Sequence, residues 1–266
     1  MSTFRTVEIS DPAFEKDHLR FITVKSKYLK GRGDICLFVP PGIESLEEIP
    51  LVILLHGVYG SCWSWALSGG VHRSAISMIN EGVIPPMLIA MPSDGLWGDG
   101  SGYVEHDGIN FEKWIAEEVP AVIKISSPGI TRFSKIFIGG LSMGGFGALK
   151  IGVKYAGIFS AISAHSSLTN LEQMKLFAEE DINHYKQIDP TEEDILETIL
   201  KYQHKLPDIR FDCGTSDTLI EENRLLHQQL LWNEITHVYM ESDGKHEWPY
   251  WQKQVRASLT FFASKC

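Results

Sequence analysis

The sequence predicts an α/β fold with a mostly parallel central sheet and helices on both of its faces. Short apolar runs of strand length alternate with segments of helix length along most of the chain. The 266 residues are 44% hydrophobic and 22% charged, which suits a protein with one sizeable core. No linker rich in proline, glycine and serine divides the sequence. We therefore expect a single domain spanning residues 1–266.

The first elements expected are two antiparallel strands at one edge of the sheet. The runs 19–25 and 34–39 flank Lys30-Gly31-Arg32-Gly33, a glycine-containing turn sequence. The core strands that follow are short apolar runs, as is typical of strands buried on both faces. They cover 51–55, 87–90, 136–138, 158–163, 209–211 and 236–240. The helices expected between them cover 73–81, 109–125, 143–155, 219–232 and 248–262.

The segment 170–205 departs from this alternation. Pro190 and two acidic triplets, at 179–181 and 192–194, separate its amphipathic pieces. We expect a short helical insertion, which could overhang a functional site because such sites gather at the carboxyl ends of parallel strands. A solvated surface excursion is the alternative.

Composition excludes several classes of function. The net charge of -10, without clusters of Lys and Arg, argues against nucleic acid as a partner. The cysteines and histidines lack the spacing of metal ligands, so we expect reduced thiols and no metal. The first ten residues lack the pattern of a secretory signal and the apolar runs are too short to span a bilayer, which predicts a cytoplasmic protein with no membrane partner. The cysteines are Cys36, Cys62, Cys213 and Cys266.

A candidate nucleophile lies between a predicted strand and a predicted helix. Gly140-Leu141-Ser142-Met143-Gly144 has the G-x-S-x-G pattern of the nucleophile elbow, in which a tight turn projects the serine hydroxyl. The pattern occurs by chance as a glycine-rich turn with a capping serine, but here the required strand and helix flank it. The helix N-terminus behind Ser142 supplies a backbone N–H where an oxyanion would form.

An acid and a base are expected later in the chain, each on a loop after a strand. Asp217 follows one predicted strand and His246 follows the next, so both loops emerge at the same edge of the sheet. Asp217 can then hold the tautomer of His246. The alternatives are Asp212, expected in or at the end of the strand, Asp243, expected in a turn, and a purely capping role for Asp217.

A second oxyanion donor is expected from the loop after the strand at 51–55. Leu55-His56-Gly57-Val58 fits this position, and the backbone N–H of Val58 should pair with that of Met143. We interpret His56 as a structural residue that forms hydrogen bonds.

These motifs resemble the esterase D, or putative-esterase, family of α/β-hydrolases over nearly the whole chain. The resemblance is carried by Leu55-His56-Gly57 with Trp65, Gly140-Leu141-Ser142-Met143-Gly144-Gly145 with Gly147-Ala148, Cys213-Gly214-Thr215 before Asp217, Asn223-Arg224 with His227, and His246 with Trp248 and Trp251. It implies the α/β-hydrolase fold and a carboxylesterase that forms an acyl-enzyme. The implied triad is Ser142, Asp217 and His246, the implied oxyanion hole is Val58 and Met143, and no cofactor is implied.

The histidine motif Gly-x-His-x-Trp resembles most closely the feruloyl, acetylxylan and tributyrin esterase branch. S-formylglutathione hydrolases usually carry Thr-Cys-Thr just past the oxyanion residue, where this sequence has Tyr59-Gly60-Ser61. The expected substrate is a small ester with a short acyl or aryl acyl group. A thioesterase of the S-formylglutathione hydrolase type, an acyltransferase and a catalytically silent binding protein are the alternatives, and a homo-oligomer is possible.

Two further residues are candidates for substrate binding. Trp97, in a glycine-rich stretch after the strand at 87–90, offers an aromatic face to an acyl group or a sugar ring, or else packs beneath its own loop. His165 follows the strand at 158–163 and is expected to line the same pocket. The acidic triplets of segment 170–205 predict a rim that repels anionic lipid and hence a preference for short acyl chains.

Overall fold

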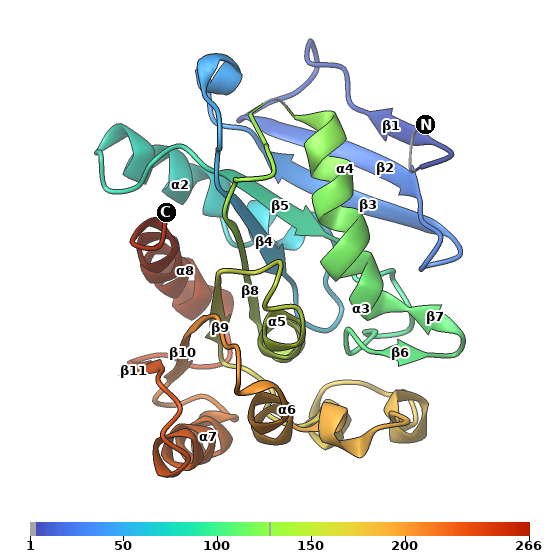
Figure 1. The fold of residues 1–266 in the computed structure, drawn as a ribbon, viewed down its shortest axis with the longest axis vertical. Helices are drawn as coiled ribbons and strands as arrows, with labels where there is room; N and C mark the ends of the chain where they lie inside the picture. Colours follow the sequence, from blue (N-terminus) through green and yellow to red (C-terminus); the bar gives the residue numbers. More distant parts are fainter. Residues whose placement is uncertain (1–3, 128) are drawn as a thin grey trace.

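The computed structural model describes residues 4–127 and 129–266 and is built on a nine-stranded sheet (Figure 1). The strand order is β1-β2-β3-β5-β4-β8-β9-β10-β11, and β1 to β3 form an antiparallel edge beside a parallel sheet. The antiparallel strands are β1 (Val7–Ile9), β2 (Leu19–Lys25) and β3 (Arg32–Phe38). The parallel strands are β4 (Leu51–Leu55), β5 (Leu88–Pro92), β8 (Ile136–Leu141), β9 (Ala161–His165), β10 (Asp208–Gly214) and β11 (Val238–Ser242). The predicted α/β architecture is confirmed.

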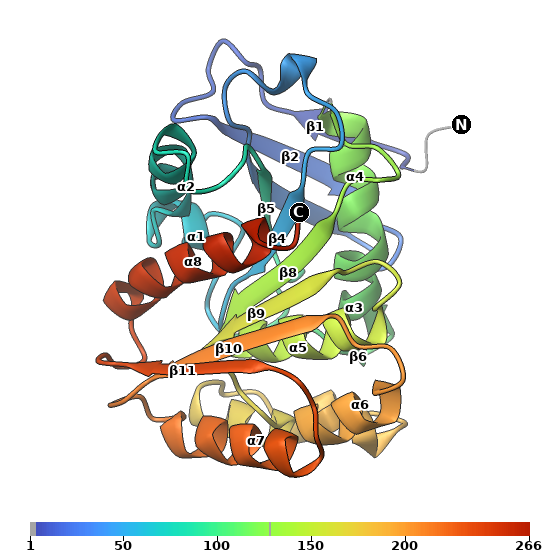
Figure 2. The same ribbon diagram turned by 60° about the vertical axis from the view of Figure 1, so that its left-hand side comes forward.

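Helices cover both faces of the sheet (Figure 2). One face carries α1 (Ser64–Leu67), α2 (Val71–Asn80) and α8 (Trp248–Ala263). The other carries α3 (Phe111–Lys113), a π-helical turn (Trp114–Glu118), α4 (Val119–Ser126), α5 (Met143–Lys154), α6 (Ile195–Tyr202) and α7 (Ile220–Trp232). No helix in the described part of the chain is both long and apolar enough to cross a membrane.

The side chains of β4 show why its sequence is continuously apolar. Leu51, Ile53 and Leu55 pack into the core shared with α4 and α5. Val52 and Leu54 point the other way, into the core shared with α2 and α8. Because alternate residues of a strand face opposite sides of the sheet, a strand with helices on both faces needs apolar residues at every position.

The structure differs from the sequence prediction at several element ends. Strand β8 continues to Leu141, directly before the candidate nucleophile. Strand β9 was expected at 158–163 but begins at Ala161 and ends at His165. The reason is that Ile158 and Phe159 donate backbone hydrogen bonds to Tyr155 O and so complete a turn after α5. The sequence pattern did not predict four short elements of the structure, which are β1, α1, β6 (Glu105–His106) and β7 (Ile109–Asn110).

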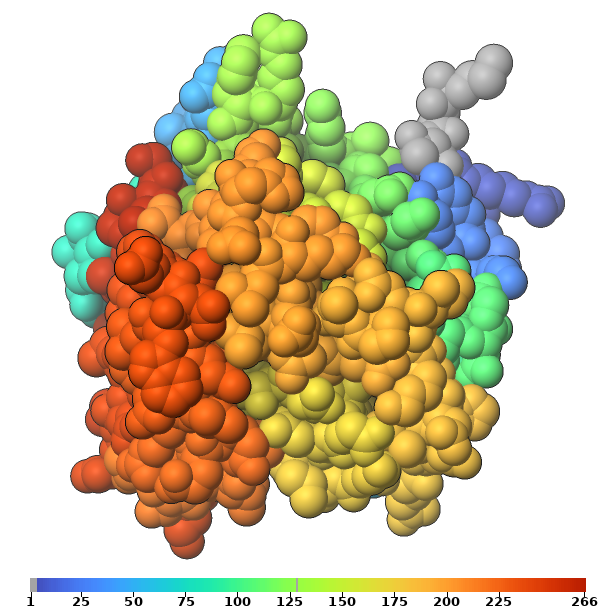
Figure 3. Space-filling model, turned by 60° about the horizontal axis from the view of Figure 1, so that its bottom comes forward, coloured from blue at the N-terminus to red at the C-terminus, as the bar shows by residue number. Residues whose placement is uncertain are grey.

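The segment 170–205 is built of short helices that lie beside α7 on the lower face of the molecule (Figure 3). Three 3₁₀ helices, Leu171–Leu176, Ile182–Tyr185 and Pro190–Glu193, precede α6. Buried side chains fix them to the core, and these are Leu171, Met174, Tyr185, Ile195 and Ile199. The segment is therefore a packed part of the molecule.

Candidate active site

Ser142 occupies the single-residue turn between β8 and α5. Its backbone has φ 55° and ψ −122°, a conformation that costs free energy for a residue with a side chain and that recurs at functional sites. Its N–H donates to the carbonyl oxygen of His165 at 2.9 Å. A Cβ atom at Gly140 would overlap the carbonyl of Gly144, and one at Gly144 would overlap the carbonyl of Leu55. The glycines of the motif are thus required by close backbone approach.

The structure brings Ser142, His246 and Asp217 into one hydrogen-bonded chain. His246 Nε2 lies 2.9 Å from Ser142 Oγ. His246 Nδ1 lies 3.0 Å from each carboxylate oxygen of Asp217. The Asp217 side chain is fully buried, whereas that of His246 is 17% exposed. An imidazole bound to a carboxylate through Nδ1 presents Nε2 as an acceptor for the serine proton.

The surroundings of Asp217 favour its charged form. Burial raises the pKa of this carboxyl group, but hydrogen bonds from His246, the N–H of Leu219 and the hydroxyl of Ser166, with the charge of His246, outweigh that effect and lower the pKa below its usual value. Asp217 is therefore held as the anion that fixes the imidazole.

The two rival carboxylates have other positions. Asp212 lies within β10, as expected, and binds His165 rather than His246. Asp243 is an exposed residue in the bend after β11. Of the three, Asp217 alone contacts His246 through hydrogen bonds.

The loop after β4 lies against the elbow. A Cβ atom at Gly57 would lie 3.3 Å from the Cβ of Ser142, and the side chains of Val58 and Met143 both approach Gly100. Among residues 4–127 and 129–266, no acceptor forms a hydrogen bond with the backbone N–H of Val58 or with that of Met143. His56 is a structural residue, because its Nε2 accepts the N–H of Asp94 at 3.1 Å and its Nδ1 then donates to Gly57 O at 2.7 Å.

The Oγ of Ser142 faces a cleft of about 250 Å³ with an aromatic lining. The lining residues are His56, Gly57, Val58, Tyr59, Gly60, Trp63, Ser64, Ser68, Leu141, Ser142, Phe177, His246, Trp248 and Trp251. Phe177 stacks on the imidazole of His246, with ring centroids 5.0 Å apart and an interplanar angle of 22°. Trp251 meets the same imidazole edge to face, at 5.0 Å and 88°.

Neither of the predicted substrate-binding residues, Trp97 and His165, is among the residues that line this cleft. Trp97 packs beneath its loop against His106, His184 and Tyr185, with ring centroids 4.5 to 5.8 Å away. His165 is fully buried. It is the last residue of β9, two positions beyond the end of the predicted strand. Its ring contacts Asp212 and Ser258 inside the protein.

His165 belongs to a second array of aspartate, histidine and serine. Its Nδ1 lies 2.8 Å from Asp212 Oδ2, and its Nε2 lies 2.9 Å from Ser258 Oγ. Tyr250 donates a further hydrogen bond to Asp212 at 2.8 Å. All four side chains are buried, so no substrate reaches this array. It joins β9, β10 and α8 underneath the loops that carry the candidate catalytic residues.

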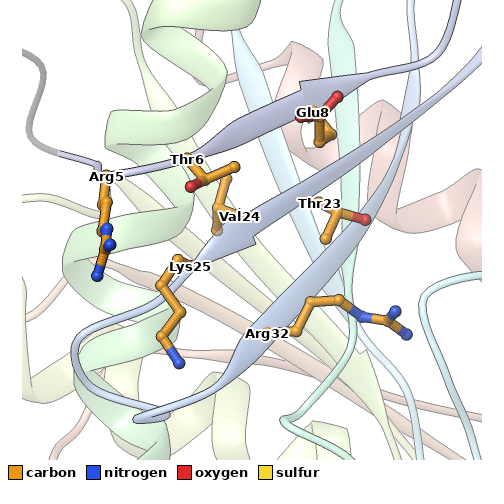
Figure 4. A pocket seen from close by; sticks show the side chains of 7 residues that line it. All are labelled: Arg5, Thr6, Glu8, Thr23, Val24, Lys25 and Arg32. Carbon is orange, nitrogen blue, oxygen red and sulfur yellow. The ribbon is translucent and has the colours of Figure 1, made fainter.

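A separate hollow of about 380 Å³ lies on the antiparallel edge of the sheet (Figure 4). Its lining includes the basic side chains of Arg5, Lys25 and Arg32. The described residues that line it include no serine, cysteine or histidine, and none of them lines the cleft at Ser142. It lacks the serine and histidine pair found at the cleft, so we do not assign the acyl-transfer chemistry to it.

Sequence reasoning missed Phe177 as a residue of the cleft. It follows the 3₁₀ helix Leu171–Leu176 in a polar segment, where no periodic pattern marks its direction. For Trp248 and Trp251 the sequence indicates only a family resemblance and no role in the cleft. Their i, i+3 spacing at the start of α8 could have placed both on one helix face near His246.

A family model and a curated relative match most of the sequence. The family described as "Putative esterase" matches residues 26–262. An acetyl esterase of Caldicellulosiruptor saccharolyticus is 28% identical over 227 residues, which cover 79% of this chain and 81% of that protein.

Solved structures match the fold over almost the whole chain. A ferulic acid esterase has a TM-score of 0.80 at 23% identity and covers 99% of this chain and 100% of its own. An S-formylglutathione hydrolase of Staphylococcus aureus has a TM-score of 0.79 at 16% identity, with 96% and 99% covered. At these identities the likeness shows the fold, and the predicted α/β-hydrolase fold is confirmed.

Proposed function

This chain belongs to the Putative esterase family, and from that membership we propose a serine esterase mechanism in which Ser142 is the nucleophile, His246 the general base and Asp217 the orienting acid. The chain is a carboxylic ester hydrolase. One observation carries the assignment of residues. A continuous hydrogen-bonded chain runs from Ser142 Oγ through both nitrogens of His246 to the buried carboxylate of Asp217, at the wall of a cleft.

In the acylation step, Ser142 Oγ attacks the carbonyl carbon of the ester while His246 Nε2 takes the hydroxyl proton. Negative charge moves to the former carbonyl oxygen. Collapse of the tetrahedral intermediate breaks the bond to the alcohol oxygen, which receives the proton from His246 and leaves. Asp217 stabilises the imidazolium that exists between these two proton transfers.

In the deacylation step, water takes the place of the departed alcohol. His246 removes a proton from the water as its oxygen attacks the acyl-enzyme, and then returns that proton to Ser142 Oγ when the acid is released. The N–H groups of Val58 and Met143, which have no partner in the described structure, are the proposed oxyanion donors in both steps.

We propose esters with short acyl groups as substrates. The cleft of about 250 Å³ accommodates a small group, and the relative from Caldicellulosiruptor saccharolyticus is an acetyl esterase. Its aromatic lining also suits an aryl acyl group of the feruloyl type. A cytoplasmic location, the absence of nucleic-acid and membrane partners and a possible homo-oligomer remain predictions from the sequence.

Replacing the nucleophile tests the proposed assignment. Ser142→Ala should keep its fold and reduce kcat on p-nitrophenyl acetate by about 10⁶-fold, because triad members act as a unit. The matched control is Ser258→Ala, which removes the serine of the buried array and should keep kcat within about threefold because substrate never reaches it. If Ser142→Ala hydrolyses the ester at the rate of the control, another residue is the nucleophile.

A further inference from the structure

Phe177 is the one residue of segment 170–205 that lines the cleft among the described residues, and it contacts the imidazole directly. Its ring lies nearly parallel to the ring of His246, at an interplanar angle of 22°. Since Trp251 meets the imidazole edge to face, the two aromatic residues contact it from different directions. A group placed beside His246 Nε2 therefore also meets Phe177.

The position of Phe177 is fixed by its neighbours in the segment. The side chains of Leu171 and Met174, on the helix that precedes it, are buried in the core. Asn170 and Gln173 cap that helix through reciprocal hydrogen bonds. Phe177 N–H donates to Met174 O at 2.9 Å. The ring is thus carried by an anchored turn of chain.

Hydrogen bonds connect the residues after Phe177 to the loop after β4, which also lines the cleft. Glu180 Oε1 accepts the N–H of Asp99 at 2.8 Å, and Asp99 Oδ2 accepts the N–H of Glu179 at 2.8 Å. The same Oδ2 accepts the hydroxyl of Tyr59 at 3.0 Å. Asp99 therefore joins the segment to the loop that bears Tyr59 and Val58.

The chemistry decides which part of an ester meets Phe177. The alcohol oxygen must receive its proton from His246 Nε2, so the alcohol group lies beside the imidazole during acylation. The carbonyl oxygen points to the N–H groups of Val58 and Met143. After the alcohol has left, only the acyl group and water remain. A side chain beside the imidazole thus contacts the alcohol in acylation and has no such contact in deacylation.

We propose that Phe177 is a specificity-determining residue for the alcohol part of the ester. Its ring favours alcohols that carry a ring over small linear alcohols. The inference rests on the proposed function of Ser142 and His246. Tyr59 and Trp63, which are 66% and 45% exposed and also line the cleft, extend the apolar surface that such a ring would contact. Stacking between rings supplies the preference.

Two pairs of esters separate the alcohol side from the acyl side. Phenyl acetate and ethyl acetate share an acyl group, whereas phenyl acetate and phenyl butyrate share an alcohol. Phe177→Leu should lower the kcat/KM ratio of phenyl acetate to ethyl acetate by about three- to tenfold, the range expected from the loss of one aromatic contact. The kcat/KM ratio of phenyl butyrate to phenyl acetate should stay within about twofold, because these two esters share the same alcohol.

Two further variants keep the test decisive. Phe177→Tyr retains the ring and should restore the preference for phenyl acetate. Phe133→Leu makes the same substitution at an exposed site outside the cleft and should leave both ratios unchanged. Equal losses on phenyl and ethyl acetate would overturn the inference. The proposed function fails separately if the wild-type protein shows no hydrolysis of p-nitrophenyl acetate that depends on Ser142.

Discussion

At the scale of single residues, the structure assigns different tasks to chemically similar side chains by burial and by partner. Asp212 and Asp217 are both buried, yet Asp212 binds the buried His165 while Asp217 binds the partly exposed His246. The decisive difference lies in the neighbouring histidine, because only His246 reaches a serine that borders the cleft. Position in the fold thus selects one aspartate for the proposed mechanism.

Replacing the proposed acid should reduce the rate without preventing the fold. Asp217→Asn is expected to lower kcat on p-nitrophenyl acetate by about 10⁴-fold, because the amide no longer holds the required tautomer of His246. Steady-state kinetics on purified protein measure this loss. Asp243→Asn is the control and should behave like wild type, since Asp243 is exposed in the bend after β11. A larger effect at Asp243 than at Asp217 would reverse their roles.

Sequence motifs predicted which residues meet at the elbow but could not predict the whole cleft. Ser142, Asp217 and His246 each occupy a loop directly after a strand, so their meeting follows from the topology. His165 was assigned to the cleft because β9 was expected to end two residues earlier than it does. Phe177 could not be predicted, because its direction depends on how segment 170–205 packs on the core.

At the scale of elements, segment 170–205 uses its acidic residues for internal contacts. Glu192 pairs with Lys150 and Lys154 of α5, and Glu193 pairs with Lys186. Glu180 accepts the N–H of Asp99. The lysines thus compensate Glu192 and Glu193, whereas Glu179 and Asp181 of the other triplet are exposed. The size of the cleft is a second reason to expect a preference for short acyl groups.

The size of the cleft predicts the preferred length of the acyl chain. Each buried methylene contributes about 0.8 kcal/mol, so kcat/KM should rise only until the cleft is filled. We expect p-nitrophenyl esters to give a maximum between acetyl and butyryl and a clear fall by octanoyl. A series of such esters at fixed protein concentration measures the profile. Activity that increases steadily through dodecanoyl would mean that the cleft opens into a larger apolar surface.

The buried ion pair between α3 and α5 should stabilise the fold strongly. Lys150 Nζ contacts Glu112, and both side chains are at most 5% exposed. Lys150→Met leaves Glu112 with less compensation for its buried charge and should lower the free energy of unfolding by about 3 kcal/mol. Lys154→Met, at a side chain that is 24% exposed, should cost less. Urea denaturation compares the two variants, and equal stability of both would contradict this ranking.

At the scale of the whole molecule, one sheet with helices on both faces holds loops from distant parts of the chain close together at one edge. Strands β4, β8, β10 and β11 each deliver a residue of the proposed mechanism just beyond their carboxyl ends. The alternation of strands and helices in the sequence was sufficient to predict this arrangement. The ends of β9 and the short antiparallel strands β1, β6 and β7 could not be predicted, because turns and the pairing of edge strands depend on tertiary contacts.

Acid should destabilise the folded protein through its buried carboxylates. Asp212, Asp217 and Glu112 have lowered pKa values in the fold, because despite burial their hydrogen bonds and cationic partners favour the charged form. Their stabilising contribution is complete above the ordinary carboxyl pKa of about 4 and is lost as the pH falls below it. The thermal midpoint should thus fall steeply below about pH 4.

The acid sensitivity has a defined control. Glu112→Gln removes one of the three titrating groups, so its thermal midpoint should fall less steeply with acid than that of wild type, although it starts lower. A wild-type midpoint that rises below pH 4 would mean that these carboxylates are not stabilised as anions in the fold.

The most direct test of the proposed mechanism is to locate the residue that becomes covalently modified. Wild-type protein treated with a fluorophosphonate and digested for mass spectrometry should carry the phosphonyl group on Ser142 alone, because His246 activates only that hydroxyl at the cleft. The modification should abolish ester hydrolysis in proportion to the labelled fraction. Labelling of a different serine, or full hydrolytic activity with Ser142 completely modified, would contradict the assignment of Ser142 as the nucleophile.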